Sequence, residues 1–243
     1  MTEFDAVVFD IGETLLDRTR EYAAWADFFG VPAHTFSAVF GAMIARGATV
    51  AEVLESFDRR DGEHSDSDSD SDSPRSVFER RVDAGAAIRL DERDLYPDAA
   101  RTIRALKARG LVVGIAGNQP AAVSEQLREL DLGADFIGSS TEWGVAKPRP
   151  EFFERVAREA GTTPARTVYV GDQVDNDVRA PQRAGLASVR ILRGPWGYLT
   201  RDAEAEAGCL AVIRSLDELV PLLGAATGTI PATWTEQNHR QPK

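Results

Sequence analysis

Short apolar runs alternate with amphipathic stretches over much of this chain. The amphipathic stretches, such as residues 98–109 and 121–130, repeat apolar side chains at helical spacing. The apolar runs predict five strands, at residues 6–9, 111–116, 136–137, 167–170 and 188–192. Strands and helices that alternate at this distance form βαβ units with right-handed crossovers. The pattern therefore predicts an α/β fold with a parallel core sheet of five strands.

The region directly after the first predicted strand has helical rather than strand periodicity. Tyr22, Trp25 and Phe29 recur at helical spacing there, and no alternating strand pattern interrupts the region. We therefore expect a helical domain inserted into the α/β core. The expected domains are a core made of residues 1–16 and 92–224 and an insertion made of residues 17–91.

Two segments lack the apolar residues that a packed core needs. Residues 61–73 hold six acidic residues and no Lys or Arg, and from Ser65 onward they alternate Ser and Asp. Like charges repel and little apolar surface can be buried, so we expect a disordered acidic loop. Residues 225–243 contain Gly, Thr and Pro with little periodicity, and we expect a mobile tail.

The charge and cysteine content exclude several classes of partner. The net charge is −11, which argues against binding to nucleic acid or to an anionic membrane. No apolar run approaches the roughly 18 residues that span a bilayer. Cys209 is the single cysteine, and the first residues lack the pattern of a secretory signal. We therefore expect a cytoplasmic protein.

Polar residues follow four of the predicted strands, where a plain structural account does not require them. In open parallel sheets, ligands bind just beyond the carboxyl ends of the strands. Each of these polar residues, taken alone, is compatible with a helix cap or a solvated side chain. The chain has only three lysines, and one of the three belongs to this set, which weakens the interpretation of that lysine as an ordinary solvated side chain. Together they predict a functional site. They are Asp10, Asn118, Lys147, Asp172, Asp175 and Asp177.

The carboxylates in this set indicate a metal ion. Asp172, Asp175 and Asp177 are crowded into one predicted turn, and like charges this close repel unless a cation lies between them. Mg²⁺ suits such a site because it is a hard ion held by a few carboxylates, by waters and often by a substrate phosphate. Asn118 begins a predicted helix, whose free N–H groups can hold an anion.

Four ordered motifs in this chain resemble those of the haloacid dehalogenase-like hydrolase superfamily. They are Phe9-Asp10-Ile11-Gly12-Glu13-Thr14-Leu15, the Gly117-Asn118 turn, Lys147-Pro148, and Gly171-Asp172 with Asp177. The resemblance covers roughly residues 4 to 220. It implies a Rossmann-like core with a helical cap of the family's first type inserted after the first strand.

The resemblance also implies a role for each motif residue. Asp10 is then the nucleophile that forms an aspartyl-phosphate, and Lys147 offsets the negative charge of nucleophile and phosphate. Phosphate oxygens are expected at Gly117, Asn118 and Thr14. The expected Mg²⁺ ligands are the carboxylates of Asp10, Asp172 and Asp177 and the backbone carbonyl of Gly12.

The chain departs from the family's motifs at two positions. Phosphatases of this family usually carry a second Asp two residues after the nucleophile, as general acid and base, and here that position is Gly12. General acid–base catalysis is typically worth about 10²–10⁴-fold in rate. Glu13 is the adjacent substitute, and a structural carboxylate explains it equally well. Gly117 stands where the family usually has Ser or Thr.

Three functions are compatible with these residues. The leading hypothesis is a Mg²⁺-dependent phosphomonoesterase that acts on a small phosphorylated metabolite. A 2-haloacid dehalogenase would use the same nucleophile without a metal; Gly12 fits that chemistry, whereas the acidic turn does not. A weakly active or non-catalytic relative is the third hypothesis, because Gly12 and Gly117 both lack a functional side chain. The sequence leaves the substrate and the oligomeric state open.

Overall fold

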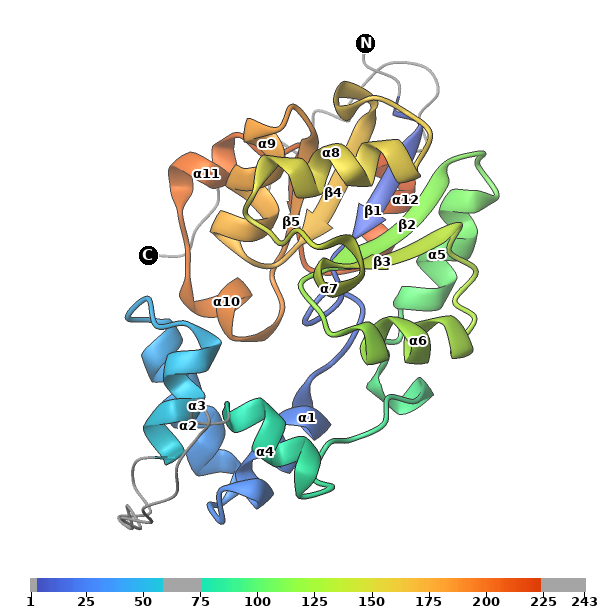
Figure 1. Ribbon diagram of the computed structural model, residues 1–243. Helices are drawn as coiled ribbons and strands as arrows, with labels where there is room; N and C mark the ends of the chain where they lie inside the picture. The colour runs from blue at the N-terminus through green and yellow to red at the C-terminus, as the bar shows by residue number, and fades with distance from the viewer. Residues whose placement is uncertain (1–3, 59–75, 224–243) are drawn as a thin grey trace. The chain divides into compact units, whose positions relative to one another are not determined.

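A single parallel sheet forms the centre of the computed structural model, which describes residues 4–58 and 76–223 (Figure 1). Its strand order is β3-β2-β1-β4-β5-β6, and every neighbouring pair is parallel. The predicted α/β class is confirmed. The strands are β1 (Ala6–Phe9), β2 (Val112–Gly117), β3 (Phe136–Ser139), β4 (Thr167–Gly171), β5 (Ala187–Ile191) and β6 (Ala211–Ile213).

The predicted number of five strands is wrong, because six strands of the described residues lie in the sheet. The additional strand is β6, which pairs with β5 and is only three residues long. A run this short gives no recognisable alternation in the sequence, and it is extended because its neighbour offers a free edge to pair with.

Helices cover both faces of the sheet. On one face, Val7 and Phe9 of β1 pack with Ile103 and Leu106 of α5. On the other face, Val8 packs with residues of α8, which Figure 1 shows lying across β1 and β4. The helices of this unit are α5 (Ala99–Lys107), α6 (Ala121–Glu129), α7 (Ser140–Trp143), α8 (Pro150–Glu159), α9 (Ala180–Arg183), α10 (Gly194–Leu199), α11 (Ala203–Ala207) and α12 (Leu219–Leu223).

Shorter helical turns connect several of these elements. Three of them are 3₁₀ turns and one is a π-helix, which directly follows β4. They are η2 (Glu92–Asp94), η3 (Pro164–Arg166), η4 (Val174–Arg179) and η5 (Leu216–Glu218). The π-helix lies at the turn for which the sequence predicts metal-binding carboxylates. Single π turns are frequent at functional sites.

The chain divides into two compact units. The described residues up to Asp17 and from Leu90 onward form the sheet-containing unit, and Arg18–Arg89 form the other. The second unit is helical and has an aromatic core in which Phe29 stacks on Trp25 and on Phe57. Its helices are α1 (Thr19–Phe28), α2 (Ala33–Ile44), α3 (Val50–Asp58) and α4 (Val77–Asp83).

Two expectations fall outside the described part of the chain. The acidic loop at residues 61–73 and the tail at residues 225–243 both lie beyond the residues that the structure describes. Within the described residues, every helix is too short or too polar to cross a bilayer.

Candidate active site

The carboxyl ends of β1 and β4 lie side by side at the centre of the sheet. Phe9 of β1 is in register with Val170 of β4, and the backbone N–H of Asp10 donates to the Val170 carbonyl at 2.8 Å. Asp172 directly follows β4. The chain passes from β1 to β2 on one side and later returns to β4 on the other, so β1 lies at a topological switch point. Ligand sites of open α/β sheets form at such points.

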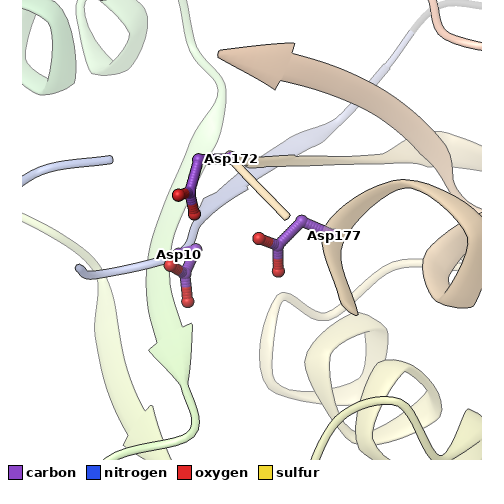
Figure 2. A group of neighbouring side chains, drawn as sticks. All are labelled: Asp10, Asp172 and Asp177. Atoms are coloured by element: carbon purple, nitrogen blue, oxygen red, sulfur yellow. The ribbon is translucent and has the colours of Figure 1, made fainter. Parts of the chain in front are cut away.

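Three carboxylates meet at this switch point. Asp10 comes from the end of β1, Asp172 from the end of β4, and Asp177 from the π-helix η4. One oxygen of each lies within 4.8 Å of the others. Figure 2 shows the three side chains gathered together, with Asp177 turned toward the other two. All three are buried, and Asp172 and Asp177 have no exposed surface. A buried group of three acids needs a compensating positive charge.

Lys147 supplies part of that charge. Its Nζ lies 2.6 Å from Asp10 Oδ1 and 2.7 Å from Asp177 Oδ1, so one cation joins two of the carboxylates. The side-chain amide of Asn118 holds the Lys147 backbone on both sides: its Oδ1 accepts from the Lys147 N–H at 2.8 Å, and its Nδ2 donates to the Lys147 carbonyl at 3.0 Å. Asn118 therefore positions the lysine.

The protonation of the site follows from burial and from these neighbours. Burial raises the pKa of Asp10 to about 6, although the charge of Lys147 opposes the rise. Burial, followed by the charges of Asp177 and Asp10, raises the pKa of Asp172 well above its usual value. Burial lowers the pKa of Lys147, but the charges of Asp10 and Asp177 outweigh it and leave that pKa well above its usual value. Lys147 is therefore a permanent cation, whereas the three acids in their ionised form would carry more negative charge than one lysine can offset.

Asp172 provides the test of whether a metal ion fits. Both of its carboxylate oxygens are buried, and neither has a hydrogen-bond partner among the described residues. Buried polar atoms are nearly always paired, and a carboxylate left unpaired is costly. Carboxylate oxygens that converge with two others are the donor set of a hard divalent cation. The residues present therefore fit a metal ion.

The fourth acidic residue of the predicted set lies apart from this group. Asp175 is exposed, and its Oδ1 pairs with the Arg179 guanidinium at 3.0 Å on the surface of η4. Sequence proximity alone therefore overstates the cluster, because the π-helix turns Asp177 inward and Asp175 outward.

The turn after Asp10 carries the remaining motif residues. Gly12 is partly buried, whereas Glu13 and Thr14 are buried. Glu13 Oε2 accepts a hydrogen bond from the Tyr96 hydroxyl at 2.7 Å. The hydroxyl of Thr14 is buried and has no hydrogen-bond partner within the described part of the chain. The Thr14 hydroxyl is thus an unused donor, whereas Glu13 has a protein partner.

Gly117 lies directly against Asp10. A β-carbon at this position would come 2.8 Å from Asp10 Oδ1 and 3.3 Å from Ile11 Cδ1. Gly117, which stands where the family usually has Ser or Thr, therefore leaves room for the position that the Asp10 carboxylate takes beside Lys147. A side chain here requires that carboxylate to move.

Two residues near the site were not among the sequence candidates. Tyr169 lies within an apolar strand and looks like an ordinary core residue, yet its ring is 5.4 Å from Lys147 Nζ and its hydroxyl donates to the Ala116 carbonyl at 2.7 Å. Arg193 follows β5 and donates to the Thr14 carbonyl at 2.9 Å. No pattern singles out Tyr169, but Arg193 is a polar residue at a strand end and the strand-end argument extends to it.

Comparison with known proteins gives one family and several relatives. The family model of the haloacid dehalogenase-like hydrolases matches residues 4–185. A glyceraldehyde 3-phosphate phosphatase of Methanocaldococcus jannaschii is 33% identical over 132 residues, which cover 53% of this chain and 56% of the relative. A phosphoglycolate phosphatase of Salmonella paratyphi A is 35% identical over 133 residues, which cover 54% of this chain and 51% of the relative. The chain thus spans about half the length of the curated relatives it matches.

Solved structures share the fold at lower identity. The L-2-haloacid dehalogenase of Xanthobacter autotrophicus superposes with a TM-score of 0.66 at 20% identity. The superposition covers 92% of this chain and all of that one. At 20% identity, the likeness shows a shared fold alone.

Proposed function

This chain belongs to the haloacid dehalogenase-like hydrolase family, and we propose that it is a Mg²⁺-dependent phosphomonoesterase of small phosphorylated metabolites. One observation carries the proposal: Asp10, Asp172 and Asp177 form a buried acidic cluster in which Lys147 bridges two members. The cluster stands at the switch point of the sheet, where ligand sites of open α/β sheets form. Its excess negative charge favours metal-assisted chemistry over a metal-free reaction.

The metal would be held by the three carboxylates and, by analogy with the family, by the Gly12 carbonyl. The two unpartnered oxygens of Asp172 support this assignment, because a bound cation gives them a partner. Mg²⁺ is the proposed ion because it prefers a few carboxylates together with phosphate oxygens. When bound, it supplies charge neutralisation for the phosphoryl group.

Asp10 is the proposed nucleophile. An oxygen of its carboxylate attacks phosphorus, the bond from phosphorus to the alcohol oxygen breaks, and an aspartyl-phosphate forms. Water then attacks phosphorus, releasing inorganic phosphate and restoring the carboxylate. Lys147 holds Asp10 Oδ1 at 2.6 Å and keeps positive charge beside the phosphoryl group in both steps. The unpartnered Thr14 hydroxyl is a proposed donor to a phosphate oxygen.

Gly12 sets the expected pattern of reactivity. It offers no side chain to protonate the departing alcohol, a contribution worth about 10²–10⁴-fold where it is present. Esters whose leaving group is stable without a proton should therefore react faster than alkyl phosphates.

The relatives suggest the substrate class. The two relatives described above are named as phosphatases of glyceraldehyde 3-phosphate and of phosphoglycolate. The first compound is a small phosphorylated aldehyde, and the second is a small phosphorylated carboxylic acid. We propose substrates of this size, rather than a nucleic acid, for a chain of net charge −11. A single cysteine is compatible with the cytoplasm as the proposed compartment.

The test is phosphate release from a panel that contains glyceraldehyde 3-phosphate, phosphoglycolate and p-nitrophenyl phosphate, each with Mg²⁺ and with a chelator. We expect release that requires Mg²⁺ and is fastest with p-nitrophenyl phosphate, because nitrophenolate leaves without a proton. Release that is undiminished in chelator contradicts the metal assignment. Chloride release from 2-chloropropionate, without phosphate release from any ester, would favour a dehalogenase, and no turnover at all would favour a non-catalytic relative.

A further inference from the structure

The backbone of Glu13 takes a conformation that its side chain does not favour. Its φ is +57°, in the left-handed region where glycine is usual and a glutamate is uncommon. Such a conformation persists only where the surrounding structure holds it in place. Glu13 is three residues after Asp10, in a turn whose other backbone bonds include Leu15 N–H and Leu16 N–H to the Ile11 carbonyl, both at 2.9 Å. The backbone N–H of Glu13 itself donates to the Leu16 carbonyl at 2.8 Å.

Tyr96 and Gly194 are among the neighbours that enclose the Glu13 side chain. The hydroxyl of Tyr96 donates to Glu13 Oε2 at 2.7 Å. Gly194 closes the other side: a β-carbon there would lie 2.4 Å from Glu13 Cγ and 2.6 Å from Cδ, so only glycine leaves room. Glu13 itself is 4% exposed. Its carboxylate is thus enclosed by protein and bonded to a phenol.

Arg193 ties this enclosure to the backbone of the nucleophile turn. Its guanidinium lies 4.1 Å from the centre of the Tyr96 ring and donates from Nη1 to the Thr14 carbonyl at 2.9 Å. Its Nη2 pairs with Asp98. The same Asp98 oxygen accepts from the N–H of Leu216 at 2.9 Å, which joins the array to the start of η5. Arg193 therefore contacts Thr14 directly and is linked to Glu13 through Tyr96.

We infer that Glu13, Tyr96 and Arg193 are positioning residues that fix the backbone of the turn after Asp10. Glu13 does not replace the general acid and base that is missing at position 12. This inference rests on the proposed phosphatase function. A carboxylate that is enclosed by Gly194 and bonded to Tyr96 acts through the geometry of the nucleophile. The contact with Tyr96 requires Glu13 to accept a hydrogen bond, and it does not require Glu13 to transfer a proton.

The test compares Glu13→Ala, Glu13→Gln, Tyr96→Phe and the Glu13→Ala/Tyr96→Phe double variant in Mg²⁺-dependent hydrolysis of phosphoglycolate, whose alkyl leaving group needs a proton, and of p-nitrophenyl phosphate, whose leaving group does not. We expect Glu13→Ala and Tyr96→Phe each to lower kcat by about 10–100-fold with little change in KM, the cost of a misplaced reacting group. The double variant should be no slower than the slower single variant. Glu13→Gln should restore kcat to within about threefold, because the amide oxygen still accepts from Tyr96. Glu154→Ala, an exposed glutamate of α8, is the matched control.

The inference is overturned if Glu13→Gln is as slow as Glu13→Ala, since a carboxyl that transfers a proton cannot be replaced by an amide. It is also overturned if the two single losses multiply in the double variant. A wild-type protein that hydrolyses no phosphomonoester contradicts the proposed function instead. The same four variants then decide the inference through the free energy of unfolding: a coupling between Glu13 and Tyr96 that Glu13→Gln keeps supports it, and additive effects overturn it.

Discussion

At the scale of single residues, the site is defined by an imbalance of charge. Of the three buried carboxylates, Asp10 and Asp177 pair with Lys147, and Asp172 has no hydrogen-bond partner in the described chain. Burial raises the pKa of Asp10 to about 6 and that of Asp172 well above its usual value. Without a metal, and at a pH between the unfolded value of 3.8 and the raised value, the carboxyl groups of Asp10 and Asp172 are therefore protonated in the folded protein and ionised in the unfolded chain.

This difference predicts how Mg²⁺ and pH act together. An acid whose pKa is raised by folding stabilises the protein below its unfolded pKa of 3.8, and that contribution is lost as the pH rises to about 6. The loss for Asp10 is at most about 3 kcal/mol. Mg²⁺ requires the deprotonated carboxylates and relieves their repulsion. We expect Mg²⁺ at about 100 times its Kd to stabilise the protein by about 3 kcal/mol near pH 8, and by much less near pH 5.

Thermal unfolding with and without Mg²⁺ at the two pH values checks this prediction. Asp172→Asn should lose most of the Mg²⁺ effect, whereas Asp175→Asn, which changes an exposed carboxylate outside the cluster, should keep it. An equal stabilisation at both pH values, or one that survives Asp172→Asn, would show that the ion binds elsewhere.

At the scale of secondary-structure elements, the positions of β1, β4 and α8 bring the site together. Residues 9 and 170 are in register, which places the two strand-end aspartates side by side. Beneath them, Phe153 of α8 meets Tyr169 of β4 edge to face, with ring centres 5.2 Å apart. Tyr169 in turn lies against Lys147, so the packing of one helix supports the cation of the site.

Phe153→Ala should therefore be strongly destabilising. The side chain is completely buried, and removing a buried phenyl ring leaves a cavity that typically costs about 3–5 kcal/mol. Urea unfolding measures the loss. The neighbouring Glu154→Ala changes an exposed position of the same helix and should alter stability by no more than about 0.5 kcal/mol. A loss below about 1 kcal/mol for Phe153→Ala would mean that α8 does not pack on β4 as described.

At the scale of the whole molecule, the fold class can be predicted from the sequence because it depends on the local periodicity of apolar residues. The apolar runs that become β1, β2 and β4 predict a parallel sheet. The carboxyl ends of parallel strands lie at the same edge of the sheet, so the polar residues that follow the strands are expected to lie close together. β6 could not be predicted, because its three residues become a strand only through pairing with β5.

The contacts of the site residues were less predictable than their positions. The partner of Glu13 is 83 residues away along the chain, and Arg193 reaches Thr14 across 179 residues. Local patterns contain nothing about such pairs. The inward turn of Asp177 and the outward turn of Asp175 likewise depend on a π-helix, whose spacing differs from that of the commoner helix. Sequence reasoning therefore finds which residues gather, and the tertiary structure decides which of them touch.

The central claim is that Asp10 is the nucleophile of a phosphatase, and Asp10→Asn tests it most directly. The substitution keeps the size of the side chain and removes the attacking carboxylate, and loss of a nucleophile in a well-studied protease lowers kcat by roughly 10⁶-fold. The measurement is Mg²⁺-dependent phosphate release by the wild-type protein and the variant, with a thermal unfolding curve to show that the variant is folded. We predict that the rate falls by at least about 10³-fold in a folded variant. A folded Asp10→Asn variant that keeps more than about a tenth of the wild-type rate would contradict the account.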